Sequence, residues 1–323
     1  MPSPSSSLST LRPELAGSML EYDHDMNARG FIGHRVAPVI ESAQQAGTFG
    51  KIPIEELLKE SDTKRAPGSG YSRGEFEFEP ASFACEEHGH EEPVDDRQAK
   101  MYASYFNAEV IAATRARAAV QRNAEKRWAA AIFNATTFAS YTTAITHEWD
   151  DATNAVPLTD VETAANAIWA ASGLWPNALI VNRKVFRNLR NCAQIIDRVK
   201  YSGFMDTRAG LITEAAIAQC FDLDHIIVAG GAKNSALEGQ TASVASVWSD
   251  EYAMLCRVAE TDDIQEPCIA RTIHWGEDGS DAGGMMESYR DETVRSDIIR
   301  DRHDVDELIM HAASGHLFSN VTT

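Results

Sequence analysis

The sequence predicts an α+β fold, built from one very long helix, a projecting hairpin and a compact α/β unit. Residues 97–138 contain no Pro or Gly and are rich in strong helix formers. Residues 75–79 (EFEFE) alternate with a period of two, which is typical of a half-buried strand. Residues 176–259 alternate short apolar runs with helical patterns, and this predicts a compact α/β unit.

The long helix would measure about 60 Å at 1.5 Å per residue. Asp95 and Asp96 stand where an N-cap and a favourable first-turn charge belong. Apolar side chains recur at helical spacing, at Met101, Tyr105, Val110, Ala113, Val120, Ala124, Trp128 and Ile132. Such a helix either pairs in a coiled coil or forms the spine of an elongated subunit. The spacing is not a strict heptad, so we favour the second interpretation and call residues 97–138 the predicted spine helix.

Composition limits the class of protein. The chain has 323 residues, enough for one large or two modest domains. It contains no apolar run long enough for a transmembrane helix. The N-terminus, MPSPSSSLSTLRPEL, lacks the basic start and apolar core of a secretory signal. Its five cysteines are odd in number and scattered, which favours reduced thiols over a disulfide framework.

The charge is strongly acidic. The formal net charge is −19, and residues 250–307 alone carry 17 Asp and Glu against 6 Arg and Lys. Such a surface repels phosphate backbones, so we expect no sequence-specific nucleic-acid binding.

The chain divides into five predicted parts. Residues 1–45 form an N-terminal arm with at most short helices, and residues 46–96 form an extended hairpin loop rich in Gly and Pro. Residues 97–175 contain the spine helix, residues 176–259 form the α/β unit, and residues 260–323 return along the spine as strands. A hairpin alone is marginally stable in water, so we expect it to lie on another surface.

The expected regular elements follow from local patterns. A helix is expected after a cap at Thr159 or Asp160, with Gly173 and Pro176 as its stop signals. Two further helices are expected at residues 183–190 and 213–221. Strands are expected at residues 178–181, 225–229, 246–248, 252–256, 269–275, 293–299 and 308–313.

Three motifs resemble chemical sites, but their context favours structural roles. Residues 70–74 (GYSRG) match G-x-S-x-G, yet that motif needs a strand, a sharp turn and a helix, and here a glycine-rich hairpin loop is expected. Residues 85–90 (CEEHGH) offer possible zinc ligands, but no second ligand pair is evident, and a polar strand end is the alternative. Residues 229–235 (AGGAKNS) lack the spacing of a phosphate loop and predict a turn after a buried strand.

The order of these elements resembles the major capsid protein of tailed bacteriophages, whose fold is shared with encapsulin shells. The resemblance covers most of the chain. The stretches that carry it are LRPELAGSMLEYD at 11–23, RAPGSGYSRGEFEFEPASFACEEHGHEEPVDDR at 65–97, AEKRWAAAIFN at 124–134, LWPNALIVNRKVFRNLRN at 174–191 and ITEAAIAQCFDLDHIIVAG at 212–230.

The resemblance implies the tailed-phage major capsid fold and a structural subunit that is not an enzyme. In such proteins the arm and the hairpin loop reach over neighbouring subunits, the spine helix belongs to a peripheral domain and the α/β unit is the axial domain. Hexamers and pentamers tile an icosahedral shell in the virion around double-stranded DNA. An encapsulin-like cellular shell around enzyme cargo is the alternative. A hydrolase built on residues 176–259, using Ser72 or the 85–90 cluster, is a third hypothesis.

The resemblance also implies partners. We expect separate scaffold and portal proteins, a possible decoration protein, assembly in the host cytoplasm, and no membrane, cofactor or metal. Some relatives cross-link covalently through a hairpin lysine, and Lys51, Lys59 and Lys64 lie in the corresponding region. Aromatic and Arg side chains on a projecting loop are typical interface anchors. Our candidate intersubunit contacts are therefore Arg65, Tyr71, Arg73, Phe76 and Phe78.

Overall fold

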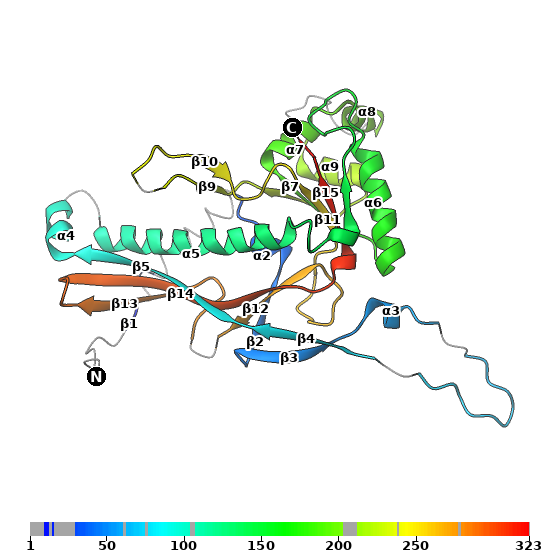
Figure 1. Cartoon of the computed structure of the whole chain (residues 1–323), viewed down its shortest axis with the longest axis horizontal. Coiled ribbons are helices and arrows are strands. Elements are labelled where there is room, and N and C mark those ends of the chain that lie inside the picture. The colour runs from blue at the N-terminus through cyan, green and yellow to red at the C-terminus, as the bar shows by residue number, and fades with distance from the viewer. Residues whose placement is uncertain are drawn as a thin grey trace.

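Two β-sheets and the helices packed on them organise the chain (Figure 1). The structure is a computed structural model, and it describes residues 10–12, 15, 30–60, 63–74, 77–103, 107–202, 212–237, 239–276 and 279–322. Within these residues the sheets have six and five strands, and two further strand pairs form hairpins. Across the same residues, no helix has the length and apolar character needed to cross a bilayer.

The six-stranded sheet is centred on its longest strand, which pairs antiparallel with three others. Its strands are β1 (Thr10–Leu11), β2 (Val39–Ser42), β5 (Glu86–Asp95), β12 (Ala270–Trp275), β13 (Met285–Asp291) and β14 (Ser296–Ile309). β14 is the central strand, with β5 along one edge and β13 and β12 in succession along the other. Segments from both ends of the chain therefore meet in one sheet.

The sequence predicted two separate strands at 293–299 and 308–313, but β14 is one continuous strand. The bounds of both predicted strands are therefore wrong. The charged stretch between the two predicted strands belongs to β14. Its acidic side chains are paired with arginines of the helix above: Arg117 Nη1 lies 3.3 Å from Asp301 Oδ1, and Arg127 lies 2.7 Å from Glu307. Asp301 is fully buried by this packing.

The prediction of one continuous spine helix at 97–138 is also wrong, because the structure has two helices in this range. α4 (Asp96–Tyr102) is followed by α5 (Ala108–Ile132), which lies along β14 and β5 (Figure 1). Asn107 begins α5: its side chain accepts a 3.0 Å hydrogen bond from the backbone N–H of Glu109. The 25 residues of α5 span about 37 Å, not about 60 Å.

The apolar spacing of the helix is confirmed in its central and C-terminal turns. Ala113, Val120, Trp128 and Ile132 are buried against the sheets. Met101, on α4, is 58% exposed, and Tyr105 lies outside the described residues. The Asn134 side chain accepts hydrogen bonds from the backbone N–H groups of the two threonines that follow Ala135, in a turn beyond the end of α5.

The five-stranded sheet forms the core of the compact unit, in the order β6-β15-β11-β7-β8. Its strands are β6 (Thr142–Ala144), β7 (Ala178–Asn182), β8 (His225–Ala229), β11 (Ala253–Cys256) and β15 (Gly315–Ser319). The strands predicted at 178–181, 225–229 and 252–256 are confirmed. β15 was not predicted, and it pairs with β11, so the last strand belongs to this sheet rather than to the one beneath α5.

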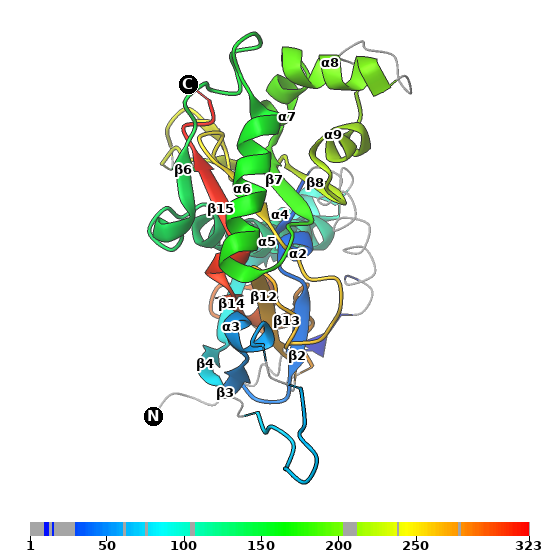
Figure 2. The same ribbon diagram turned by 90° about the vertical axis from the view of Figure 1, so that its right-hand side faces the viewer.

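Helices cover the compact unit, as Figure 2 shows. They are α6 (Pro157–Ser172), α7 (Arg183–Leu189), α8 (Ala193–Ser202) and α9 (Glu214–Phe221). α6 ends as predicted at Gly173, whose φ of +68° is the left-handed conformation that glycine adopts easily. Thr213 caps α9, and α8 was not predicted.

Short elements complete the chain. They are α2 (Gly33–Val36), β3 (Ala46–Lys51), α3 (Ile54–Leu57), β4 (Glu79–Ala84), η1 (Ala139–Tyr141), β9 (Ala232–Asn234), β10 (Val244–Ser246) and η2 (Ala312–Ser314). β4 begins at Glu79, so the predicted strand at 75–79 is wrong for residues 77–78, and residues 75–76 lie outside the described part. The strand expected at 246–248 is wrong for residues 247–248, because β10 spans Val244–Ser246.

Candidate intersubunit surfaces

The hairpin of β3 and β4 projects from the body of the molecule (Figure 1). The two strands pair antiparallel, from Ala46 opposite Ala84 to Lys51 opposite Glu79. Every residue in the range 63–74 is exposed. An exposed loop of this length, held on a regular hairpin, is positioned to contact another molecule.

Two of the predicted contact residues lie against each other in the loop. The Arg65 guanidinium lies 4.8 Å from the centroid of the Tyr71 ring, and its Nε donates a 2.7 Å hydrogen bond to the backbone carbonyl of Ser69. Tyr71 remains 74% exposed. A guanidinium stacked on an exposed aromatic ring presents a broad, partly apolar face at low cost in side-chain entropy.

The hairpin lysines have local partners. Lys51 Nζ lies 3.8 Å from Glu79 across the hairpin, and Lys59 Nζ lies 3.2 Å from Glu56 one helical turn away. Lys64 lies in the exposed loop. Nothing in this geometry assigns any of the three lysines to a cross-link.

The G-x-S-x-G match lies in the exposed loop, without the strand and helix that a nucleophilic serine requires. The glycine-rich loop that the context predicts is what the structure has. Within residues 229–235, the turn is Gly230 and Gly231 after the end of β8, and it is followed by β9 instead of a helix.

The 85–90 cluster is divided by the sheet. Cys85, directly before β5, is buried and its Sγ contacts the carbonyl of Ile273 at 3.6 Å. His88 and His90 lie on one face of β5 and line a hollow together with residues of α5. Burial, together with the nearby Asp306 and Asp304, raises the pKa of the Cys85 thiol to about 11. In the described part of the chain, no three His, Cys, Asp or Glu side chains converge on a point where a metal ion could bind.

A buried carboxylate, which sequence reasoning missed, joins distant segments. Glu125 on α5 accepts hydrogen bonds from the backbone N–H groups of Ile32 and Gly33, at 2.8 and 2.9 Å. It also accepts a 2.6 Å bond from the Trp248 indole N–H. Burial raises the pKa of Glu125, and these three donors oppose that rise. An isolated Glu in a helical pattern gives no signal of this role.

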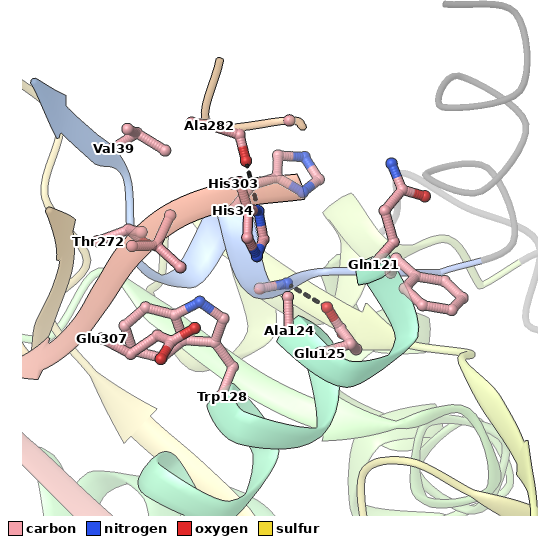
Figure 3. Close-up of a pocket in the computed structure, with 14 residues that line it drawn as sticks. His34, Val39, Gln121, Ala124, Glu125, Trp128, Thr272, Ala282, His303 and Glu307 are labelled. Carbon is pink, nitrogen blue, oxygen red and sulfur yellow. Dashed lines mark hydrogen bonds between the residues drawn. The ribbon is translucent and has the colours of Figure 1, made fainter. Parts of the chain in front are cut away.

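Glu125 borders a cavity of about 220 Å³ between α2, α5 and the six-stranded sheet (Figure 3). His34, Trp128, His303 and Glu307 also line it. His303 Nδ1 lies 3.1 Å from the Ala282 carbonyl oxygen, and burial lowers the pKa of His303 to about 4. The imidazole is therefore neutral at pH 7.

A histidine elsewhere has the partners of a catalytic base. His274 Nδ1 lies 2.7 Å from Glu41 Oε2, and Nε2 lies 3.2 Å from Ser280 Oγ. The imidazole is only 1% exposed. The arrangement links β12 to β2 and to the loop that contains Ser280, and the buried ring gives a substrate little access.

Comparisons with known proteins agree with this architecture. No family model matches the chain. The major capsid protein of Burkholderia phage BcepMu is 26% identical over 206 residues, which are 61% of this chain and 63% of that protein. The match thus spans less than two thirds of that relative. The major capsid protein of Pseudomonas phage JBD67 is 23% identical over 269 residues, covering 82% of this chain and 83% of that protein.

Solved structures are similar over nearly the whole chain. A phage-related protein from Bordetella bronchiseptica RB50 superposes with a TM-score of 0.70 at 23% identity, covering 97% of this chain and 98% of that one. A chain of the capsid structure of Cyanophage P-SCSP1u gives a TM-score of 0.56 at 11% identity, covering 88% of this chain and 86% of that one. The chain has the tailed-phage major capsid fold. A virus-like particle from Pyrococcus furiosus, with a TM-score of 0.52 at 13% identity over 93% and 100% of the chains, has the same fold.

In this capsid fold, four of the five predicted contact residues lie in the described part of the hairpin loop. Arg65, Tyr71 and Arg73 are exposed, and Phe78 is 58% exposed beside Gly50 of β3. Phe76 lies outside the described residues. Their role at an interface stays a prediction, as does the five-part division of the chain.

Proposed function

We propose that this chain is the major capsid protein of a tailed phage, which builds an icosahedral shell from hexamers and pentamers. The observation that carries the proposal is the capsid fold over almost the whole chain, together with sequence relatives that are phage major capsid proteins. The function is mechanical, so no side chain is assigned a catalytic role.

The mode of assembly follows from the surfaces that the subunit leaves open. The loop of the hairpin lies at the surface of the subunit, because residues 63–74 are all exposed. We place Arg65, Tyr71, Arg73, Phe76 and Phe78 against the neighbouring subunit. A contact between different surfaces of identical copies forms a ring when its rotation closes, as pentamers and hexamers require.

The proposal includes partners and location. The shell encloses double-stranded DNA without sequence-specific binding, and separate scaffold and portal proteins, with a possible decoration protein, assist its assembly in the host cytoplasm. The net charge of −19 supports this proposal, because an acidic shell repels DNA over most of its surface and can enclose DNA without adhering to it.

An encapsulin-like shell is the second candidate, because the virus-like particle from Pyrococcus furiosus has the same fold. The sequence relatives favour the phage capsid. The content of particles from the native source separates the two candidates: packaged DNA supports the capsid, and an enclosed enzyme supports the encapsulin.

The direct test is negative-stain electron microscopy of the expressed chain. Closed icosahedral particles, or rings of five and six, are the expected result. If only small uniform particles form, candidate scaffold proteins are added. A chain that remains monomeric with every scaffold contradicts the proposal.

A further inference from the structure

A basic cleft lies on the compact unit, in a chain whose net charge is −19. Two adjoining hollows of about 440 and 460 Å³ share Arg183 and Arg187 of α7. Arg35 of α2 and Arg190, directly after α7, also line the first hollow, where Glu214 is the acidic lining residue. No acidic side chain lines the second. We call Arg35, Arg183, Arg187 and Arg190 the arginine cleft.

The two sides of the short helix α7 have different roles: one lines the cleft and the other packs on the core. Arg183, Arg187 and Arg190 follow the i, i+4, i+7 spacing of a single helix face. Val185 and Leu189 of the same helix are fully buried. The apolar side fixes α7 to the core, so the basic side is held toward solvent.

Arg35 reaches the cleft through a close backbone crossing. The N–H of Gly230, after β8, donates a 2.9 Å hydrogen bond to the Gly30 carbonyl. Gly30 has a φ of +93°, and a Cβ there would lie 2.4 Å from the Gly230 nitrogen. Only glycine fits this crossing, which sets α2 beside β8 and α7.

The ion pairs among the described residues leave positive charge in the cleft. Lys184 Nζ on α7 lies 2.9 Å from Asp250 Oδ2, so this lysine has a carboxylate partner. Arg35, Arg183 and Arg187 have no ion pair with any described residue of the chain. The Arg190 guanidinium stacks on the Phe186 ring at 5.3 Å, which limits its rotamers. Like charges one turn apart destabilise a helix, so this arrangement favours an external anion.

We propose that the arginine cleft binds the phosphate backbone of the packaged duplex DNA, and therefore faces the interior of the shell. This inference rests on the proposed capsid function. The row from Arg183 to Arg190 extends about 10 Å along the helix axis, and a DNA strand presents a phosphate about every 3.4 Å of its axis. Guanidinium groups bind phosphate through two parallel hydrogen bonds, without reading the base sequence.

The salt dependence of binding tests the cleft. Full-length subunits are titrated into a fluorescent duplex of arbitrary sequence at several salt concentrations, and the affinity is followed by anisotropy. In R183Q/R187Q, the slope of log affinity against log salt should fall in magnitude by about 1.8, or about 0.9 per lost phosphate contact. R183K/R187K keeps the charges and should keep the slope.

The matched control is R122Q/K126Q, which removes two positive charges at the same i, i+4 spacing on α5. It should leave the slope within experimental error. An equal fall in both double variants overturns the proposal, because binding would then follow net charge alone. If R183Q/R187Q fails to fold by circular dichroism, R35Q tests the cleft from another element, with an expected fall of about 0.9.

Assembly is measured on the same variants by negative-stain microscopy. Normal shells of R183Q/R187Q, with reduced DNA retention after opening, support the proposal. If R183Q/R187Q loses the shells but keeps the wild-type slope of log affinity for DNA against log salt, the proposal is overturned. The cleft would then bind an acidic surface of a second copy of the chain. If the wild-type chain forms no shells, the proposed function fails, whereas the slope still reports on the cleft.

Discussion

At the scale of single residues, Glu125 joins three parts of the chain that are far apart in sequence. Its carboxylate is the acceptor for two backbone N–H groups before and within α2 and for the indole of Trp248. The side chain is 4% exposed, so water cannot replace these bonds. Glu125 thereby fixes α2 and the Trp248 loop to α5.

Replacing Glu125→Ala should lower the free energy of unfolding by about 3 kcal/mol or more, because three buried donors lose their acceptor. Glu125→Gln should cost less, because one acceptor oxygen remains. Denaturant unfolding of the subunit, followed by tryptophan fluorescence, gives both values. Glu162→Ala, at an exposed position of α6, is the control and should change stability by less than about 0.5 kcal/mol. A Glu125→Ala value as small as the control contradicts this role.

His303 makes stability depend on pH. Its folded pKa of about 4 lies below the ordinary value of 6.5, chiefly because of burial, with Arg127, His88 and Arg117 nearby. The unfolded chain therefore binds a proton first as the pH falls. The contribution of His303 to the free energy of unfolding is fully present above pH 6.5 and is lost as the pH falls from 6.5 to 4. At pH 5 the loss is about 2 kcal/mol.

Unfolding of the subunit at pH 7 and pH 5 checks this prediction. His303→Gln should remove that part of the pH dependence, because glutamine does not titrate. His225→Gln, which replaces an exposed histidine at the start of β8, should leave the pH dependence as in wild type. If His303→Gln loses as much stability at pH 5 as wild type, the buried imidazole is not its source.

At the scale of elements, the sequence predicted what apolar periodicity can show. The burial of Val120, Trp128 and Ile132 and the strands β7, β8 and β11 followed from local pattern. The break before α5 did not, because Asn107 is compatible with a helix interior and acts as a cap only when its side chain turns back to Glu109.

Charged stretches limited the prediction of strands. β14 carries Arg, Asp and His side chains that local pattern assigns to solvent, and its burial depends on arginines of α5 and on Arg300 and Arg302 bonding to Glu287 of β13. β15 was missed because its partner β11 is about 60 residues earlier in the sequence. The arginine cleft depends equally on the distant crossing of Gly30 and Gly230.

The cap at Asn107 gives a prediction for α5. Asn107→Ala should destabilise the subunit by about 1 kcal/mol, because the first turn loses a side-chain acceptor. Asn107→Asp keeps an acceptor and adds a favourable charge at the helix start, so it should be neutral or stabilising. Thermal or denaturant unfolding measures both. Equal effects of Ala and Asp would mean that α5 does not begin at this cap.

At the scale of the whole molecule, stability and assembly are assigned to different regions. The two sheets share apolar clusters with α5 and with the helices of the compact unit, so the folded body is self-sufficient in its core. The hairpin loop contributes nothing comparable, since residues 63–74 are all exposed. The structure therefore permits changes in the loop that alter assembly alone.

The double substitution R65A/Y71A removes the stacked pair of the loop and tests this separation. The free energy of unfolding of the subunit should change by less than about 0.5 kcal/mol, because both side chains are at the surface. Shell formation, measured by negative-stain microscopy and size-exclusion chromatography, should be lost or strongly reduced, because aromatic and Arg anchors dominate interfaces. Glu60→Ala, at an exposed position between α3 and the loop, is the control and should assemble normally. Normal shells from R65A/Y71A would show that the neighbouring subunit is held by other residues, and a large loss of stability would show that the loop supports the body of its own chain.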